Sequence, residues 1–305
     1  MTALDTTAAS LSRYGKVVRD MPLSKHTTFG IGGPADVFVT VTSSADLAQA
    51  VRVVREVELP LFVLGSGSNV LVADAGVRGV VIDNRAREEQ LDDSGSMARL
   101  SSGASLAAFA RRMCRRGLGG LAWAVGIPGT LGGAVVYNAG AYGGCLADVL
   151  TRVEMVDRGG ETRWYEAAEL NLGYRGSLLT RKALAGRTIT EIDISLRPAA
   201  AEDLLAEAAA YDKKRLAAQP RGRNAGSMFK NPDEGPAWKL IDAVGMRGAR
   251  IGDAAISGKH SNFFVNYGEA RAAEVAELVE EAERRVLDQA GIRLVREVAF
   301  VGDWS

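Results

Sequence analysis

Ser227 is the hydroxyl whose surroundings most invite chemistry, because it ends a turn of small residues, Ala225-Gly226-Ser227. A serine nucleophile needs a histidine base that an aspartate orients. The chain has only two histidines, His26 and His260, and no G-x-S-x-G elbow surrounds the serine. His260 is a lone histidine beside an apolar strand, which favours a structural role. These features argue against Ser227 as an activated nucleophile. They leave open whether Ser227 is a turn residue or takes part in another kind of chemistry.

A second candidate site is a loop of small residues, Gly65-Ser66-Gly67-Ser68-Asn69, that follows an apolar run. Consecutive small residues let backbone N–H groups turn inward and bind an anion such as a diphosphate. The loop is neither the dinucleotide fingerprint G-x-G-x-x-G nor a Walker A loop. A tight turn between two strands is the plain alternative.

A long glycine- and alanine-rich segment, residues 118–149, carries little charge. It is too apolar for a linker, and its glycines favour backbone that is packed closely around something. Together with the loop at 65–69, it could hold a large flat cofactor that carries a diphosphate.

Basic side chains cluster twice. The first cluster lies near the end of an expected helix, where a solvated cationic face is favoured over a phosphate patch; it contains Arg111, Arg112, Arg115 and Arg116. The second precedes the Ser227 turn, where it could either clamp a diphosphate or form a solvated helix end; it contains Lys214, Arg215, Arg221 and Arg223.

The elements that must position these residues follow from periodicity and caps. Helices are expected at 43–58, 105–117, 202–217 and 269–290, and strands at 35–41, 59–65, 69–74, 79–83, 98–103, 151–157, 188–198, 260–268 and 292–302. Strand, helix and strand alternate over residues 30–83, which is typical of an α/β unit. A boundary near residue 198 suggests two regions.

Composition narrows the function classes. The 305 residues carry 37 basic and 37 acidic side chains, and this balance argues against a nucleic-acid binder. The chain has two cysteines outside any CxxC pair and two histidines; this composition argues against a metal site, and we expect none. The chain shows no apolar h-region of a signal peptide and no membrane-length apolar run. We therefore expect a cytoplasmic protein with free thiols and no membrane partner.

Six motifs occur in order along nearly the whole chain, and together they resemble the UDP-N-acetylenolpyruvoylglucosamine reductase family. The motifs are KHTTFGIGGPAD (25–36), LGSGSNVLVAD (64–74), GIPGTLGGAVVYNAGAYGG (126–144), GYRGS (173–177), NAGSMFKNP (224–232) and EV (297–298). Each motif alone is weak, but six in order at suitable spacing are highly specific.

The resemblance implies an α+β fold. An FAD-binding domain of the vanillyl-alcohol-oxidase type, built from two α/β subdomains, precedes a smaller α+β substrate domain. On this reading residues 1–20 are an N-terminal extension, 21–198 the FAD-binding domain with subdomains at about 21–85 and 86–198, and 199–305 the substrate domain. FAD is held noncovalently, and NADPH is the co-substrate.

The family activity is that of UDP-N-acetylmuramate dehydrogenase, which acts in peptidoglycan precursor synthesis. NADPH reduces the flavin, whose N5 then delivers hydride to the enolpyruvyl methylene of UDP-N-acetylglucosamine enolpyruvate. By resemblance, Ser227 donates the proton, while Arg175 and Glu297 stabilise the enolate. The bland alternatives are an ordinary ion pair for Arg175 and a solvent-facing charge on a final strand for Glu297.

The resemblance also assigns binding residues. Those expected at FAD are Gly65, Ser66, Gly67, Ser68, Asn69, Gly126, Ile127, Pro128, Gly132, Gly133, Ala134, Asn138, Ala139, Gly140, Ala141, Tyr142 and Tyr174. Those expected at the substrate are Lys214, Arg215, Lys230 and Asn231. The short run from Tyr174 to Leu196 has no later tyrosine, so the chain resembles the shorter family type without the tyrosine-bearing loop.

Two other functions remain as alternatives. Another FAD-dependent sugar or alcohol oxidoreductase would keep the 65–69 loop without Ser227, Arg175 and the Lys214-Arg215 pair together. A nucleotide-sugar binding protein without redox activity would bind no flavin. A monomer is favoured.

Overall fold

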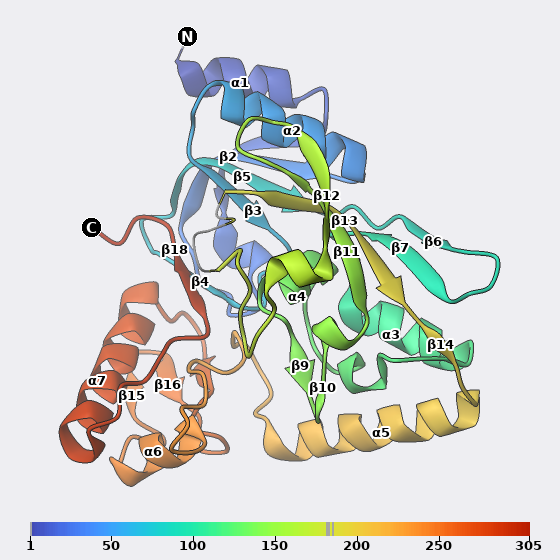
Figure 1. The fold of residues 1–305 in the computed structure, drawn as a ribbon. Helices are drawn as coiled ribbons and strands as arrows, with labels where there is room; N and C mark the ends of the chain where they lie inside the picture. Colours follow the sequence, from blue (N-terminus) through green and yellow to red (C-terminus); the bar gives the residue numbers. More distant parts are fainter. Residues whose placement is uncertain (1, 181–183, 185) are drawn as a thin grey trace. The chain divides into compact units, whose positions relative to one another are not determined.

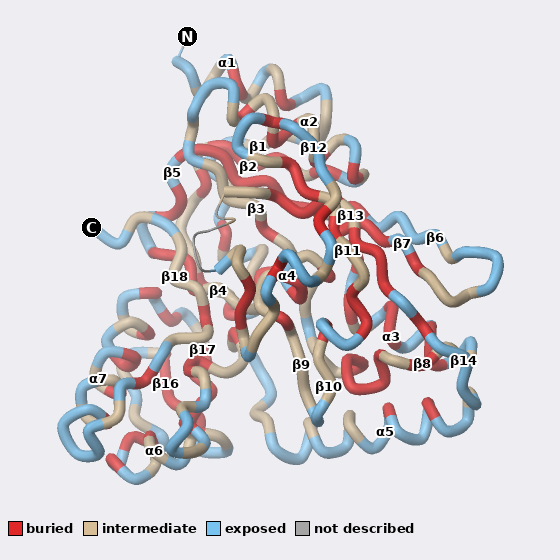
Figure 2. The backbone as a smooth tube through the Cα atoms, viewed as in Figure 1, coloured by how far each residue is buried: buried red, intermediate tan, exposed pale blue. Residues whose placement is uncertain are grey.

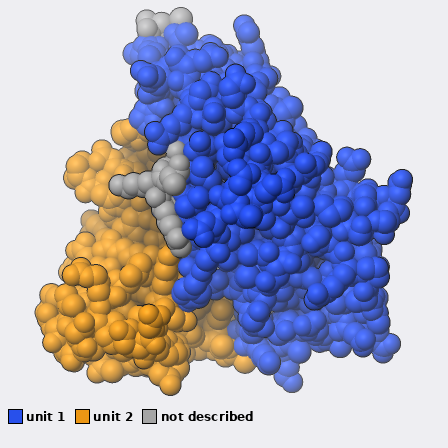
Figure 3. Space-filling view, in the orientation of Figure 1, with its two compact units in different colours: residues 1–19, 37–65, 79–215 blue, residues 20–36, 66–78, 216–305 orange. Residues whose placement is uncertain are grey.

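The computed structural model describes residues 2–180, 184 and 186–305, which form two compact units (Figure 3). The first unit contains residues 1–19, 37–65 and 79–215, and the second contains residues 20–36, 66–78 and 216–305. Both units are therefore discontinuous in sequence. The three segments expected from sequence, 1–20, 21–198 and 199–305, stay a prediction about domains.

Runs of strands are interspersed with helices along the chain (Figure 1). The helices are α1 (Ala3–Leu11), α2 (Ser44–Glu56), α3 (Leu106–Arg115), α4 (Leu131–Val136), α5 (Ala201–Ala218), α6 (Ala237–Ala243) and α7 (Ala272–Ala290), with 3-10 turns at Leu23–His26, Ala122–Ala124, Leu146–Asp148 and Ala167–Leu170. The strands are β1 (Lys16–Pro22), β2 (Pro34–Val41), β3 (Leu61–Leu64), β4 (Val70–Val72), β5 (Val77–Asn84), β6 (Glu89–Leu91), β7 (Met97–Ser101), β8 (Leu118–Gly119), β9 (Gly140–Ala141), β10 (Gly144–Cys145), β11 (Leu150–Val156), β12 (Thr162–Glu166), β13 (Thr188–Ser195), β14 (Arg197–Pro198), β15 (Arg250–Ile251), β16 (Ala254–Ile256), β17 (Phe264–Asn266) and β18 (Ala299–Val301).

The four expected helices are confirmed, and their ends carry the capping groups that the sequence indicates. The Ser43 hydroxyl accepts the Asp46 N–H at the start of α2, and Ser105 caps α3 in the same way. Gly291 ends α7 in a left-handed conformation with φ 70°. Helices α1, α4 and α6 were not expected, because each is short and lacks a long apolar stripe.

The expected strand at 292–302 is wrong over most of its length, since only Ala299–Val301 is β18. The residues before it bond to the Ser227 segment instead: Lys230 donates its N–H to the Val295 carbonyl, and Glu297 donates its N–H to Met228. A loop that is distant in sequence therefore replaces a neighbouring strand as the partner of this segment.

The first unit contains two larger sheets and the two-stranded sheets β10-β9 and β14-β8. One of the larger sheets has the order β1-β2-β5-β3, with β3 parallel to β5, and the other is the antiparallel sheet β12-β11-β13-β7-β6. Helix α2 buries Leu47, Val51 and Val54 in a core with strands β2 and β5. Helix α5 is exposed along most of its length, with only Leu204 and Ala208 buried (Figure 2).

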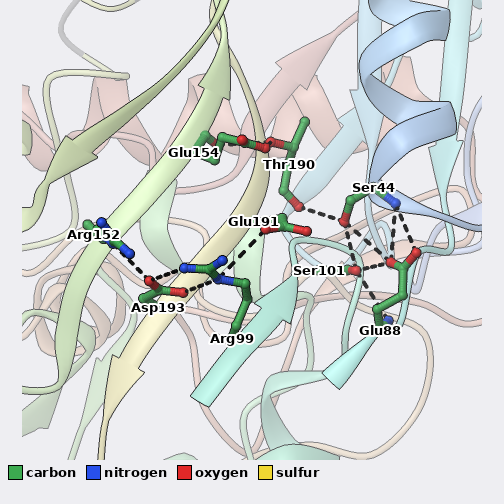
Figure 4. Close-up of polar contacts among 9 residues, drawn as sticks. All are labelled: Ser44, Glu88, Arg99, Ser101, Arg152, Glu154, Thr190, Glu191 and Asp193. Atoms are coloured by element: carbon green, nitrogen blue, oxygen red, sulfur yellow. Dashed lines mark hydrogen bonds and ion pairs between the residues drawn. The ribbon is translucent and has the colours of Figure 1, made fainter. Parts of the chain in front are cut away.

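A polar network joins α2 to the second of these sheets (Figure 4). The Glu88 carboxylate accepts the Ser44 N–H at 3.1 Å and also bonds to the hydroxyl of Ser101, which is buried. Farther along the sheet, Asp193 accepts hydrogen bonds from Arg99 and Arg152 at 2.8 Å each. The bonds of Glu88 fix the start of α2, and those of Asp193 fix the side chains on the face of the sheet.

The second unit has a core of its own. The antiparallel sheet β15-β16-β17 and the parallel pair β4-β18 contribute to it together with α6 and α7. Phe229 and Phe264 are buried at its centre, with ring centroids 6.1 Å apart. Phe229, two residues after Ser227, is thus anchored in a packed core and gives the Ser227 segment a rigid base.

Candidate functional site

The Ser227 hydroxyl is half-buried and, among the residues that the structure describes, hydrogen-bonds to no protein group. Its neighbours, by contrast, are all held. Gly226 donates its N–H to the Asn224 side chain at 3.0 Å, and Met228 donates its N–H to the Asn262 carbonyl at 2.8 Å. The backbone therefore fixes this serine, while its hydroxyl stays available to a ligand.

Glu297 lies alongside the same segment in the second unit. Its N–H donates to the Met228 carbonyl at 2.7 Å, and its own carbonyl accepts the Asn69 side-chain N–H at 3.2 Å. Asn69 also accepts the Ala299 N–H through its carbonyl at 3.0 Å. The structure thus brings Ser227, Glu297 and Asn69, which the sequence places far apart, into one hydrogen-bonded strip.

Arg175 belongs to the first unit, where it is the second central residue of a tight turn between Gly173 and Gly176. It adopts φ 49°, an uncommon conformation for a residue with a side chain. Its guanidinium donates to the Gly140 carbonyl at 2.7 Å. Tyr174, beside it, is 61% exposed. A strained turn that presents an arginine and an exposed tyrosine motivates a functional role.

The 65–69 loop provides backbone donors. Among the described residues no protein acceptor takes the N–H groups of Ser66, Gly67 and Asn69, and the Ser66 and Ser68 hydroxyls lie 3.3 Å apart. Gly67 has φ 65°, and a Cβ atom there would lie 2.2 Å from the His26 carbonyl oxygen, so only glycine fits. This donor set fits an anionic group such as a diphosphate.

Residues 126–142 would contact a cofactor mainly through their packing surface rather than through backbone N–H groups. The N–H groups of most predicted contacts already bond within the first unit: those of Ile127, Gly132, Gly133, Ala134, Asn138 and Ala139. Asn138 is buried and left-handed, and its side chain donates to the Gly173 carbonyl at 3.0 Å. It therefore ties this segment to the Arg175 turn.

Arg215 and Tyr142 lie together at the end of α5 in the first unit. The Tyr142 ring stacks on Tyr211 with centroids 4.5 Å apart, and burial lowers the pKa of the Arg215 guanidinium. Arg215 has no acceptor among the described residues, and a Cβ atom on Gly126 would lie 2.9 Å from its Cδ. A half-buried guanidinium without a protein acceptor is suited to bind an anion.

The positions of the other predicted substrate residues give weaker support for substrate binding. Lys214 is exposed, with its ammonium 5.9 Å from the Tyr211 ring centroid. Asn231 accepts the Ala237 N–H at 3.0 Å, which caps the start of α6, and Lys230 is half-buried one residue before it. The first basic cluster forms ion pairs, Arg111 with Asp212 at 2.7 Å among them, which supports the solvated-face reading.

Comparison with known proteins identifies the family. The C-terminal-domain model of UDP-N-acetylenolpyruvoylglucosamine reductase matches residues 218–301, and an FAD-binding-domain model matches residues 35–166. The reductase of Desulfosudis oleivorans is 42% identical over 94% of this chain and 95% of its own, and that of Heliobacterium modesticaldum is 43% identical over 95% and 92%. The chain belongs to the UDP-N-acetylenolpyruvoylglucosamine reductase family.

A solved structure supports the same assignment to the reductase family. The crystal structure of the enzyme from Thermus caldophilus matches with a TM-score of 0.81 and 37% identity, over 94% of this chain and 100% of that one. The predicted family, the α+β fold with an FAD-binding domain of the vanillyl-alcohol-oxidase type and a smaller C-terminal domain, and the oxidoreductase class are confirmed.

Two further findings concern predicted absences and the predicted loop. Within the described ranges, no helix has both the length and the apolar character needed to cross a bilayer, and no three metal-ligating side chains gather. Residues 181–183 and 185, inside the run that was compared with the tyrosine-bearing loop, lie outside the described residues. The assignment to the shorter family type stays a prediction.

Asn262 is the member of the site that sequence reasoning missed. It was taken for part of a strand at 260–268, yet its buried side chain bonds both backbone groups of Phe229. A polar residue inside an otherwise apolar run, Ser261-Asn262-Phe263-Phe264, was the available signal. Its partner, however, lies 33 residues away and periodicity does not reveal it.

Proposed function

We propose that this enzyme reduces the enolpyruvyl ether of UDP-N-acetylglucosamine to UDP-N-acetylmuramate in peptidoglycan precursor synthesis, with noncovalent FAD and NADPH. When bound, FAD accepts a hydride from NADPH and supplies it to the methylene carbon of the enolpyruvyl group. The 65–69 loop would hold the diphosphate of FAD through the backbone N–H groups of Ser66, Gly67 and Asn69. The 126–142 segment, with Tyr174, would line the remainder.

Ser227 completes the addition to the substrate double bond. As hydride arrives at the methylene carbon, the double-bond electrons move to the neighbouring carbon and spread into the substrate carboxylate. The Ser227 O–H donates its proton to that carbon, and the serine oxygen recovers a proton from solvent. A hydroxyl is a weak acid, but a carbanion is a strong base, so no histidine is required.

Arg175 and Glu297 act on the charge that develops. A guanidinium remains cationic at all relevant pH values and can bind a carboxylate through two parallel hydrogen bonds, so Arg175 would hold the substrate carboxylate. Glu297, protonated or sharing a proton, would hydrogen-bond the enolate. Arg215 and Lys214 would hold the substrate diphosphate, with Lys230 beside it and Asn231 at the uracil. We place the reaction in the cytoplasm and favour a monomer.

The observation that carries this proposal concerns the Ser227 hydroxyl. Its backbone holds it next to Glu297, and no residue in the described part of the chain hydrogen-bonds to it. The test is anaerobic. The purified holoenzyme is reduced with NADPH, and the enolpyruvyl sugar nucleotide is added while flavin absorbance is followed. We expect rapid reoxidation and formation of UDP-N-acetylmuramate. Reoxidation by O2 but not by this substrate would reject the reductase and favour another FAD-dependent sugar or alcohol oxidoreductase.

A further inference from the structure

Asn262 grips the chain on the C-terminal side of Ser227. Its side-chain oxygen accepts the Phe229 N–H at 2.9 Å, and its side-chain N–H donates to the Phe229 carbonyl at 2.8 Å. Its backbone carbonyl accepts the Met228 N–H at 2.8 Å. Three hydrogen bonds from one residue thus hold the two residues that follow the serine. Asn262 is 3% exposed, so water does not readily replace these bonds.

The bonds matter because the Ser227 hydroxyl makes no hydrogen bond to a described protein group, so backbone contacts alone hold the serine. Before the serine, the Gly226 N–H bonds to the Asn224 side chain of the same turn, and Ser227 forms an isolated bridge with Phe263. After the serine, the position of the chain depends on Asn262. A displacement of about 1 Å from the productive geometry can slow a reaction about 100-fold.

The same hydrogen bonds to residues 228 and 229 also position the Glu297 backbone. The Met228 carbonyl accepts the Glu297 N–H at 2.7 Å, so a shift of residues 228–229 moves both the serine and the glutamate backbone. Neighbouring residues of the 257–266 segment hold the earlier part of the loop: Lys259 donates to the carbonyls of Leu216 and Gln219 at 2.8 Å each. Lys259 and Asn262 therefore hold the chain on either side of the Ser227 turn, at the end of α5 and at residues 228–229.

We propose that Asn262 is a positioning residue for proton transfer from Ser227. This inference rests on the function proposed above. Asn262 touches neither substrate nor FAD in this role and acts through the Phe229 backbone. Its loss should consequently affect the step in which the serine gives up its proton and leave hydride transfer from NADPH to FAD intact.

The test compares both half-reactions of Asn262→Ala by anaerobic stopped flow. We expect reduction of the flavin by NADPH within about twofold of the parent enzyme and reoxidation by the enolpyruvyl substrate slowed about 10- to 100-fold. In turnover, kcat should fall more than KM changes. The solvent deuterium isotope effect on reoxidation should rise, because proton transfer becomes the slow step. Asn262→Asp is nearly isosteric and keeps the acceptor for the Phe229 N–H, but it puts a carboxylate oxygen in place of the donor to the Phe229 carbonyl. It should show the same selectivity and serves if the alanine variant loses FAD.

Asn266→Ala is the matched control. Asn266 is also buried, on β17 of the same unit, and its side chain makes three hydrogen bonds, to Phe29, Gly268 and Ala270. None reaches residues 227–229, so its replacement should lower stability without separating the half-reactions. If the Asn262 variants slow both half-reactions equally, match the control in their ratio, or leave reoxidation unchanged, the positioning role is rejected. If the parent enzyme itself fails to reoxidise with the substrate, the proposed function fails instead.

Discussion

Ser227→Ala separates the catalytic reading of this serine from the structural one, because the two readings predict opposite effects on stability and rate. A turn serine would stabilise the loop through its hydroxyl and contribute nothing to chemistry. A proton donor would contribute nothing to the fold and much to one half-reaction. The structure supports a quantitative expectation for each.

The expected change in stability is small. The Ser227 hydroxyl makes no hydrogen bond to a described protein group, so its removal breaks none, and we expect the free energy of unfolding to change by about 0.5 kcal/mol or less. Positioned proton donors typically contribute about 100- to 10,000-fold to a rate. Reoxidation of reduced flavin by the enolpyruvyl substrate should slow by that factor, while NADPH reduces the flavin at the parent rate.

Ser261→Ala is the complementary control. Ser261 is fully buried, and its hydroxyl donates to the Asp242 carboxylate, which also pairs with Arg247. Loss of a hydrogen bond to a charged group costs about 1.5–3 kcal/mol, so this variant should be destabilised yet keep both half-reactions near the parent rates.

Urea unfolding and anaerobic stopped flow on the two serine variants give the four values needed. Equal slowing of both half-reactions in Ser227→Ala would contradict the assignment of Ser227 as proton donor. So would a loss of stability as large as that in Ser261→Ala, since it would reveal a hydrogen bond that the hydroxyl makes in the folded protein.

Two further predictions concern the stability of the second unit. The Asp74 carboxylate accepts the N–H groups of Ala272 and Ala273 at 2.8 and 3.0 Å and thereby caps α7, so Asp74→Ala should lower the free energy of unfolding in urea by about 1–2 kcal/mol, and Asp74→Asn, which keeps one acceptor, by less; equal stability of Asp74→Ala and parent would exclude the cap. Burial, followed by the nearby Arg247 charge, lowers the pKa of His260 from 6.5; the unfolded chain therefore binds the proton more readily, and the contribution of His260 to stability, complete above about pH 6.5, is lost as pH falls below it. His260→Gln should flatten the pH dependence of thermal unfolding between about pH 7 and 5, and an unchanged slope would contradict this assignment.

Local signals in the sequence predicted the long helices, and the resemblance to a known family implied the fold class. The apolar stripe expected on α7 was Val275, Leu278, Val279, Ala282, Val286 and Leu287. The first five are buried in the core of the second unit as the 3.6-residue period requires, whereas Leu287 is 41% exposed. Short elements were not predicted. Helix α4, for example, spans only Leu131–Val136 inside a glycine-rich run, where packing rather than helix propensity determines the local structure. The strand expected at 292–302 failed for a related reason: alternation marks residues that can pair, but not the partner they choose.

Residue types and motifs pointed to Ser227, Glu297 and Arg175, yet they could not indicate what positions them. Arg175 reaches its place through a left-handed turn and a bond to Gly140, and Glu297 through the Met228 carbonyl. These are long-range backbone contacts that leave no periodic trace in the chain. Motif matching identifies the groups that react, whereas their support has to be read from hydrogen bonds.

Within the described ranges, the Ser227 hydroxyl has no protein partner, and this limits how it can be held in place. A hydroxyl that must give its proton to a carbanion loses acidity and reach if it is already bonded to a protein acceptor, so side-chain hydrogen bonds cannot hold it in place. Backbone contacts have to do so, and on the C-terminal side they come from Asn262. A buried side chain that satisfies both backbone groups of Phe229 meets this requirement, and an amide is the neutral side chain with one donor and one acceptor at matching spacing. The proposed role of Ser227 as proton donor would thus account for the presence of a buried asparagine 35 residues later in the chain, at Asn262.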